Sequence, residues 1–187
     1  MKIKTIHLAI LIFFLVIILS VSLIYSVFSS QTSQSSNFQN LSGSSTIYLI
    51  YSSSCPHCHH LIETLQSLDL KGVSIIQSMN GKEAFYCLNQ RNFTWNFGVP
   101  IVFALVNDKL IVIEGYPSSS QDVNGYFLGK EKEESFCKSM NGNPIYDNSG
   151  NYLFCKLPDG TILGNKYAIE YLIDLCKKNS CQAFCSL

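Results

Sequence analysis

The chain has 187 residues, of which 13 are basic and 13 acidic, so its formal net charge is zero. Nothing in this balance suggests nucleic-acid binding, and no nucleic-acid partner is expected. Its 8 cysteines agree with an oxidising compartment outside the cytoplasm.

Residues 1–28 predict a membrane anchor. Lys2 and Lys4 precede residues 6–28, a run without Asp, Glu, Lys or Arg. A spanning helix needs about 20 mostly apolar residues, whereas the apolar core of a cleaved secretory signal has only about 7–15. The two lysines predict a cytoplasmic N-terminus and an extracytoplasmic domain. Serines inside the run leave cleavage of a signal as the alternative.

Residues 29–45 are rich in Ser, Gln and Asn and carry no charge, which predicts a flexible tether. A folded domain is expected over residues 46–187, with an insertion or embellishment at about residues 117–165.

The sequence Cys55-Pro56-His57-Cys58 lies between an apolar run at 47–51, expected to be a strand, and a helix expected over 59–70. A cysteine at the first turn of a helix meets unsatisfied N–H groups and the positive end of the helix dipole, both of which stabilise a thiolate. Cys55 is therefore the expected attacking sulfur. Cys58, one turn later and more buried, is the expected resolving sulfur.

The two residues between the cysteines have predicted roles of their own. Pro56 suits the first helical turn, where no N–H bond is lost. His57 can donate to the thiolate, which stabilises the reduced form and raises the reduction potential. The Pro56-His57 dipeptide thus favours an oxidant or isomerase over a strong reductant. His59 and His60 add a zinc site as the alternative, although neighbouring residues in so short a run cannot all converge on one ion.

Further along, residues 73–77 predict a strand and residues 82–90 a helix. Gly98-Val99-Pro100 then precedes an apolar run at 101–106, and a tight turn at Asn107 leads into a second strand at 110–114.

With these motifs, residues 44 to 116 resemble the thioredoxin superfamily. The resemblance implies an α/β thioredoxin-like fold, a central mixed β-sheet flanked by helices. It also implies a cis Val99-Pro100 bond opposite the two cysteines, where Val99 and Pro100 bind substrate backbone. The Pro-His dipeptide is the one that periplasmic thiol oxidases carry, but the interval before Pro100 is too short for their helical insertion. Ser54 and Leu49 depart from the family, which has an aromatic residue and a buried acid there.

The C-terminal part predicts a helix over residues 121–140 and then a small β-meander with turns at Asn148-Ser149-Gly150 and Pro158-Asp159-Gly160. A helix over 166–178 would be the terminal helix of the core, displaced by this insertion; a separate C-terminal module is the alternative.

Six cysteines lie outside the motif and are candidates for structural disulfides: Cys87, Cys137, Cys155, Cys176, Cys181 and Cys185. Sequence alone leaves their pairing open. Cys87 is expected to be a small buried residue, to pair with the C-terminal region, or to relay electrons. Cys137, Gly142, Cys155 and residues 157–160 weakly resemble a small module of putative haemolysin-type lipoproteins, and that resemblance implies a Cys137–Cys155 bridge.

Together these patterns predict a membrane-anchored, extracytoplasmic thiol–disulfide oxidoreductase of the oxidase or isomerase type, acting through Cys55 and Cys58 on exported proteins. Its expected partners are protein thiols and disulfides, with a membrane protein as candidate redox partner. No cofactor and no bound metal are expected. The alternatives are a non-catalytic binding or adhesion module with a structural disulfide, and a metal-delivery protein.

Overall fold

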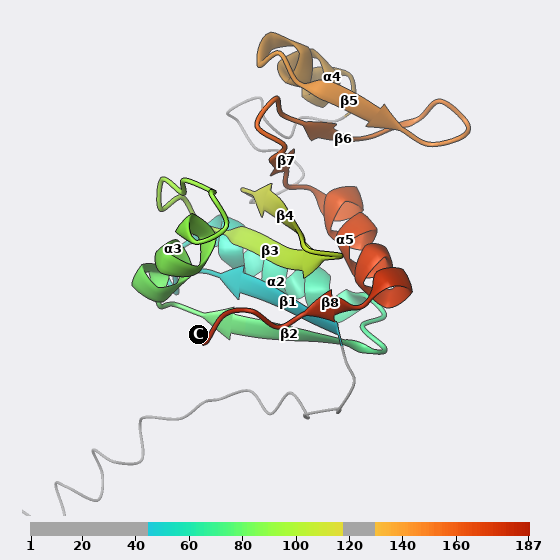
Figure 1. The fold of residues 1–187 in the computed structure, drawn as a ribbon. Coiled ribbons are helices and arrows are strands. Elements are labelled where there is room, and N and C mark those ends of the chain that lie inside the picture. The colour runs from blue at the N-terminus through green and yellow to red at the C-terminus, as the bar shows by residue number, and fades with distance from the viewer. Residues whose placement is uncertain (1–44, 118–129) are drawn as a thin grey trace, which may run out of the picture. The chain divides into compact units, whose positions relative to one another are not determined.

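The computed structural model describes residues 45–117 and 130–187 (Figure 1). The predicted anchor at 6–28 lies outside the described residues, as does the predicted tether except Ser45. Among the residues described, no helix is long and apolar enough to cross a membrane.

The described chain is an α/β protein with a mixed sheet and four helices (Figure 1). The elements are β1 (Ser45–Ile50), α2 (Pro56–Ser67), β2 (Val73–Ser78), α3 (Gly81–Asn89), β3 (Ile101–Val106), β4 (Lys109–Glu114), α4 (Lys130–Ser139), β5 (Asn143–Tyr146), β6 (Tyr152–Lys156), β7 (Ile162–Leu163), α5 (Lys166–Asn179) and β8 (Cys181–Gln182). The strand order is β2-β1-β3-β4-β7-β6-β5, with β8 paired to β3. The β1–β2 and β4–β7 pairs are parallel and the others antiparallel.

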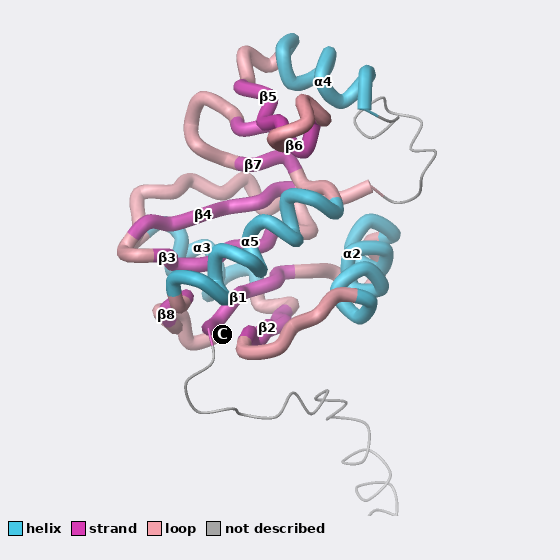
Figure 2. Tube along the Cα trace, turned by 90° about the vertical axis from the view of Figure 1, so that its right-hand side faces the viewer, coloured by secondary structure: helices cyan, strands magenta, loops and turns pink. Residues whose placement is uncertain are grey.

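Helices cover both faces of the central strands (Figure 2). Helices α2 and α5 pack on one face, where Leu61 and Leu172 join Leu49 in a core cluster. Helix α3 packs on the other face, where Leu88 and Tyr48 belong to a second cluster. All six residues of β1 are buried, because its side chains alternate between the two cores. This double burial explains why residues 47–50 of the strand are continuously apolar in sequence.

The predicted meander is present, but it extends the central sheet instead of standing apart. Its last strand, β7, lies beside β4 and pairs with Ile113 and Glu114 (Figure 1). The N–H of Gly164 donates to the carbonyl of Glu114 at 2.9 Å. A Cβ at Gly164 would overlap the backbone of Gly115, so this close approach requires glycine.

Several predicted boundaries shift. Helix α2 begins at Pro56, three residues before the expected start, because Cys55 caps it. Of the helix expected over 121–140, Lys130–Ser139 is helical, and residues 121–129 lie outside the described part. Ser45, assigned to the tether, is a buried residue of β1 whose hydroxyl donates to the carbonyl of Cys176. The short strand β8 was not expected from sequence.

Candidate active site

The two motif cysteines lie at the junction of β1 and α2. Cys55 is the N-cap of α2, and its Sγ accepts from the N–H of Cys58 at 3.2 Å. The two residues form a disulfide, with Cα atoms 5.2 Å apart. Cys58 is fully buried and Cys55 is partly exposed. Cys55 is therefore the sulfur that a partner molecule can reach.

The loop before β3 faces this disulfide. The carbonyl oxygen of Val99 lies 3.7 Å from the Sγ of Cys55, and the Val99-Pro100 bond is cis, as the family resemblance implies. Pro100 is buried, whereas Val99 is partly exposed. The backbone of Val99 is thus positioned beside the partly exposed sulfur of Cys55.

The histidines of the motif region contact three different backbone carbonyls. His57 Nδ1 lies 2.6 Å from the carbonyl of Tyr116, His60 Nδ1 lies 2.6 Å from that of Pro117, and His59 Nε2 lies 2.8 Å from that of Ser53. A carbonyl only accepts, so each of these ring nitrogens carries the proton. The Nδ1 of His57 is therefore directed at Tyr116 and not at a sulfur. Among the described residues, no three His, Cys, Asp or Glu side chains are grouped so as to hold a metal ion.

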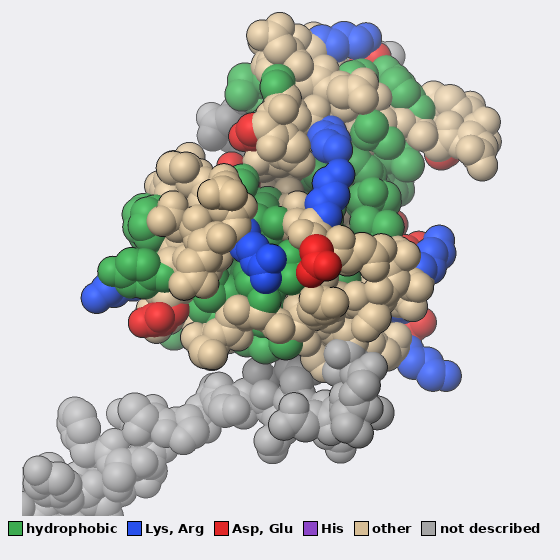
Figure 3. Space-filling view, in the orientation of Figure 1, with side chains coloured by type: hydrophobic (Ala, Val, Ile, Leu, Met, Phe, Trp, Pro, Cys, Tyr) green, Lys and Arg blue, Asp and Glu red, His purple; other side chains and the backbone are tan. Residues whose placement is uncertain are grey.

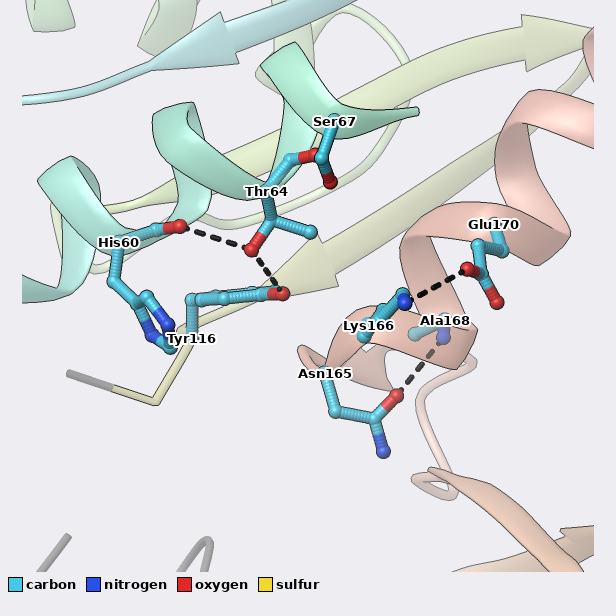
Figure 4. Close-up of polar contacts among 8 residues, drawn as sticks. All are labelled: His60, Thr64, Ser67, Tyr116, Asn165, Lys166, Ala168 and Glu170. Carbon is cyan, nitrogen blue, oxygen red and sulfur yellow. Dashed lines mark hydrogen bonds and ion pairs between the residues drawn. The ribbon is translucent and has the colours of Figure 1, made fainter. Parts of the chain in front are cut away.

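Tyr116 links the strand end after β4 to helix α2. Its hydroxyl donates to Thr64 Oγ1 at 2.9 Å, and Thr64 in turn donates to the carbonyl of His60 at 3.0 Å (Figure 4). Burial raises the pKa of Tyr116, so it acts here as a neutral donor. Sequence reasoning did not single out Tyr116, because a tyrosine after a strand has no distinctive local pattern.

A cavity of about 570 Å³ adjoins this network. Its lining includes His60, Thr64 and Tyr116 on one side and Glu133 and Asn165 on the other. The Nδ2 of Asn165 donates to Glu133 Oε2 at 3.1 Å, while burial raises the pKa of the Glu133 carboxyl. The cavity therefore combines an apolar lining with several polar side chains, and it adjoins helix α2, which carries Cys58.

Exposed apolar side chains border the Val99 loop. Met79, Tyr86 and Phe97 are 62%, 52% and 57% exposed, and the ring of Phe85 stacks on Phe97 with centroids 5.0 Å apart. We call Phe85, Tyr86 and Phe97, which are joined by ring contacts, the aromatic patch. Phe97 precedes Val99 by only two residues, so its Cα lies within about 7 Å of the Cα of Val99. Sequence reasoning did not single out this patch, although the aromatic residues at 93, 95 and 97 are a visible signal.

Phe97 has a positive φ of 65°, a conformation that costs a non-glycine residue about 1–3 kcal/mol. Buried Trp95 supports it: the two rings lie 5.0 Å apart, and Trp95 Nε1 donates to the carbonyl of Gly98 at 2.9 Å. A large apolar side chain is thus held in solvent at a backbone cost, two residues before Val99, whose carbonyl oxygen lies near Cys55 Sγ.

The resemblance would place a buried acid near position 49, but the residue there, Leu49, is an apolar residue of the core. Glu63, the acidic residue of the following helix α2, is exposed.

All eight cysteines are paired. The Cys137–Cys155 bridge implied by resemblance is present. Cys87 pairs with Cys185 in the C-terminal region, one of the outcomes left open by the sequence. Cys176 pairs with Cys181 across the end of α5.

Searches with this chain against protein-family models, curated proteins and solved structures found no match.

Proposed function

We propose that residues 46–187 adopt a thioredoxin-like fold and that the chain is a membrane-anchored, extracytoplasmic thiol–disulfide oxidoreductase of the oxidase or isomerase type. The fold proposal is supported by the parallel β1–α2–β2 unit, the antiparallel β3–β4 pair and helix α5 packed on the same sheet face as α2. Thioredoxin-like proteins share this arrangement.

The observation that carries the functional proposal is the placement of the disulfide. The partly exposed Cys55 lies at the N-cap of α2 and faces the carbonyl of Val99, and the buried Cys58 lies one turn later. On reduction, the Cys58 N–H that now contacts Cys55 Sγ becomes a donor to a thiolate and stabilises it. A disulfide that only cross-linked the chain would not require a partly exposed sulfur at the N-terminus of a helix.

In the oxidising direction, a substrate thiolate attacks Cys55 Sγ. A substrate–Cys55 bond forms, the Cys55–Cys58 bond breaks, and Cys58 leaves with the electron pair as a thiolate. The second substrate thiolate then attacks the substrate sulfur of the mixed disulfide, and Cys55 leaves as a thiolate. The substrate loses two electrons, which reduce the cysteine pair. Isomerisation starts instead with attack by reduced Cys55.

The aromatic patch supports an unfolded protein as the substrate, because exposed apolar side chains beside a reactive group offer burial to apolar segments that folded proteins hide. The membrane placement rests on residues 6–28 and the two lysines before them. Exported proteins that acquire disulfides would then be the substrates.

Substitution of the resolving cysteine tests the mechanism. In Cys58→Ala, a mixed disulfide on Cys55 cannot be released by Cys58, so we expect covalent complexes on non-reducing gels that reductant dissolves. Cys55→Ala in the same background removes the attacking sulfur and serves as the control. Absence of complexes with Cys58→Ala contradicts the mechanism.

The reduction potential distinguishes the proposed activity from a structural disulfide. The full chain is equilibrated with glutathione buffers, and the alkylation of each cysteine is read by peptide mass spectrometry. We expect Cys55 and Cys58 to open well before the other three pairs, at a potential nearer the value of about −120 mV for strong oxidases than the value of about −270 mV for thioredoxin. If they resist reduction like the other pairs, the binding-module alternative replaces this proposal.

A further inference from the structure

A second cavity lies at the outer edge of β4, between this strand and the turn that joins β6 to β7. Its volume is about 370 Å³, within the usual range for small-molecule sites of about 300–1,000 Å³. It shares no lining residue with the cavity beside Tyr116.

The cavity exists because β4 is only partly paired on its outer side. Strand β3 pairs with all of Lys109–Glu114, whereas β7 pairs with Ile113 and Glu114 alone. No other described strand covers the outer edge of residues 109–112. The carbonyl of Glu114 points outward, to the N–H of Gly164. The N–H and C=O groups of one residue point to the same side of a strand, and this side alternates from each residue to the next. The N–H groups of Leu110 and Val112 therefore also point outward. These N–H groups are donors on the cavity side.

The charged residues around this cavity are mainly basic. Arg91, Lys109 and Lys156 line it, against the single acid Asp159. None of the three basic side chains is in a salt bridge with a described residue. Asp159 is already engaged by the N–H of Thr161, 2.9 Å from its Oδ1. Figure 3 shows Lys and Arg side chains at the level of β4 and β7, next to hydrophobic ones.

A buried hydroxyl in the lining has no partner. Thr161 is only 2% exposed, and its Oγ1 makes no hydrogen bond within the described structure. A buried hydroxyl without a partner costs about 1–3 kcal/mol, so a ligand that supplied an acceptor would recover this loss.

Most of the remaining lining is apolar or aromatic. It includes Phe93, Leu110, Phe154, Ile162 and Tyr171. A ligand that satisfied only the basic groups would leave this surface unfilled.

We propose that this cavity binds a small organic anion, with a carboxylate or phosphate group against Arg91, Lys109 and Lys156 and an apolar body over Phe154 and Tyr171. The anionic oxygens also accept from the Thr161 hydroxyl. This site is independent of Cys55 and Cys58 and does not rest on the proposed redox activity.

Fluorine NMR with the full chain in lipid nanodiscs tests the proposal, with empty nanodiscs as the blank. The probes are fluorinated phenylpropionate, fluorinated phenyl phosphate and the neutral fluorinated phenylpropanol. We expect saturable line broadening for at least one anion and binding of the alcohol at least about tenfold weaker, since it lacks the charged head group. The tighter anion identifies the head group. No saturable anion binding, or equal affinity for the alcohol, overturns the proposal.

Substitutions locate the binding. Lys109→Gln and Lys156→Gln should each weaken anion binding by about tenfold, whereas Lys82→Gln, an exposed lysine outside the lining, should not. Thr161→Val should weaken it by about fivefold, the equivalent of one hydrogen bond, and should leave the melting temperature unchanged or raised because the unpartnered hydroxyl is gone. Unchanged binding in all three cavity variants shows that the anion binds elsewhere and overturns the proposal.

Discussion

At the scale of single residues, the loop before Val99 contains a residue that is both strained in its backbone and exposed. Phe97 combines a positive φ with a largely exposed ring, and neither property is favourable for a phenylalanine on stability grounds. Strain of this kind persists where the surroundings enforce it, and it concentrates at functional sites. Trp95 provides that enforcement here.

Phe97→Asn tests whether the ring contacts substrate. Asparagine tolerates positive φ better than other non-glycine residues, so the loop should be retained. We expect kcat/KM for a reduced, unfolded protein to fall about tenfold, the effect of losing roughly 1.4 kcal/mol of binding. The rate with glutathione should stay unchanged. Met140→Asn, an exposed apolar residue outside the patch, is the control. Equal losses with both substrates would mean that the substitution had damaged the disulfide site itself.

Glu114 makes stability depend on pH. Burial raises the pKa of its carboxyl, and the negative charge of Asp159 adds to this. Above the ordinary glutamate pKa of about 4.3, the unfolded chain has released a proton that the folded protein still holds. The free energy of unfolding therefore falls as pH rises from there to the raised folded-state pKa. Burial also raises the pKa of the Glu133 carboxyl, so this group likewise lowers the free energy of unfolding as pH rises.

Glu114→Gln removes the titrating group. We expect its stability advantage over the parent protein to be larger at pH 7 than at pH 4, as measured by urea unfolding. Glu63→Gln, at an exposed position on α2, should show no such difference. If the stability advantage of Glu114→Gln were the same at both pH values, the pKa of Glu114 would not be raised in the folded protein.

At the scale of elements, the Cys137–Cys155 bridge ties α4 to β6, and the chain turns between them at Gly142. The N–H of Gly142 donates to the carbonyl of Cys137 at 2.8 Å. A Cβ at Gly142 would lie 2.9 Å from Cys137 Sγ and 3.0 Å from the Cys137 carbonyl oxygen. The disulfide and the turn therefore fit together only when this residue lacks a side chain.

Gly142→Ala should lower the free energy of unfolding by about 1–3 kcal/mol, the usual cost of overpacking. Gly81→Ala is the matched control, because the nearest atom to its Cβ would be a Trp95 ring carbon at 3.5 Å, an ordinary contact. Alanine also favours the helix there. Equal stabilities of the two variants in urea would contradict the expected crowding at Gly142.

The central elements were predictable because their signals are local. The apolar run of β1, the turn at Asn107 and Asp108, both with positive φ, and the stripe on α5 each lie within a short stretch of sequence. Strand β8 has only two residues, too few for a hydrophobic pattern. It forms because the bridge from Cys176 to Cys181 turns the chain back toward β3.

At the scale of the whole molecule, the C-terminal tail closes onto the sheet. The hydroxyl of buried Tyr48 accepts from the N–H groups of Phe184 and Cys185 at 2.9 and 3.0 Å. The Phe184 ring packs against the rings of Tyr48 and Phe103. The Cys87–Cys185 bridge then links the tail to α3 across 98 residues of chain.

The double variant Cys87→Ala/Cys185→Ala should lower the free energy of unfolding by roughly 4 kcal/mol, because closing a loop of about 100 residues restricts the unfolded chain to that extent. Urea unfolding without reductant measures the difference. In strong reductant the parent and the variant should converge, since the parent then also lacks the cross-link. A difference that survives reduction would point to lost packing instead.

The sequence by itself determined the strand–cysteine–helix junction, the Val99-Pro100 loop and the α/β alternation, because each depends on residues near one another in the chain. Tertiary structure alone decided that Cys87 pairs with Cys185, that Phe97 stands exposed over Trp95, and that β7 leaves the edge of β4 open at 109–112. These features join segments that are distant in the sequence. Their geometry depends on how the two cores pack the helices onto the sheet, and no local sequence pattern specifies that packing.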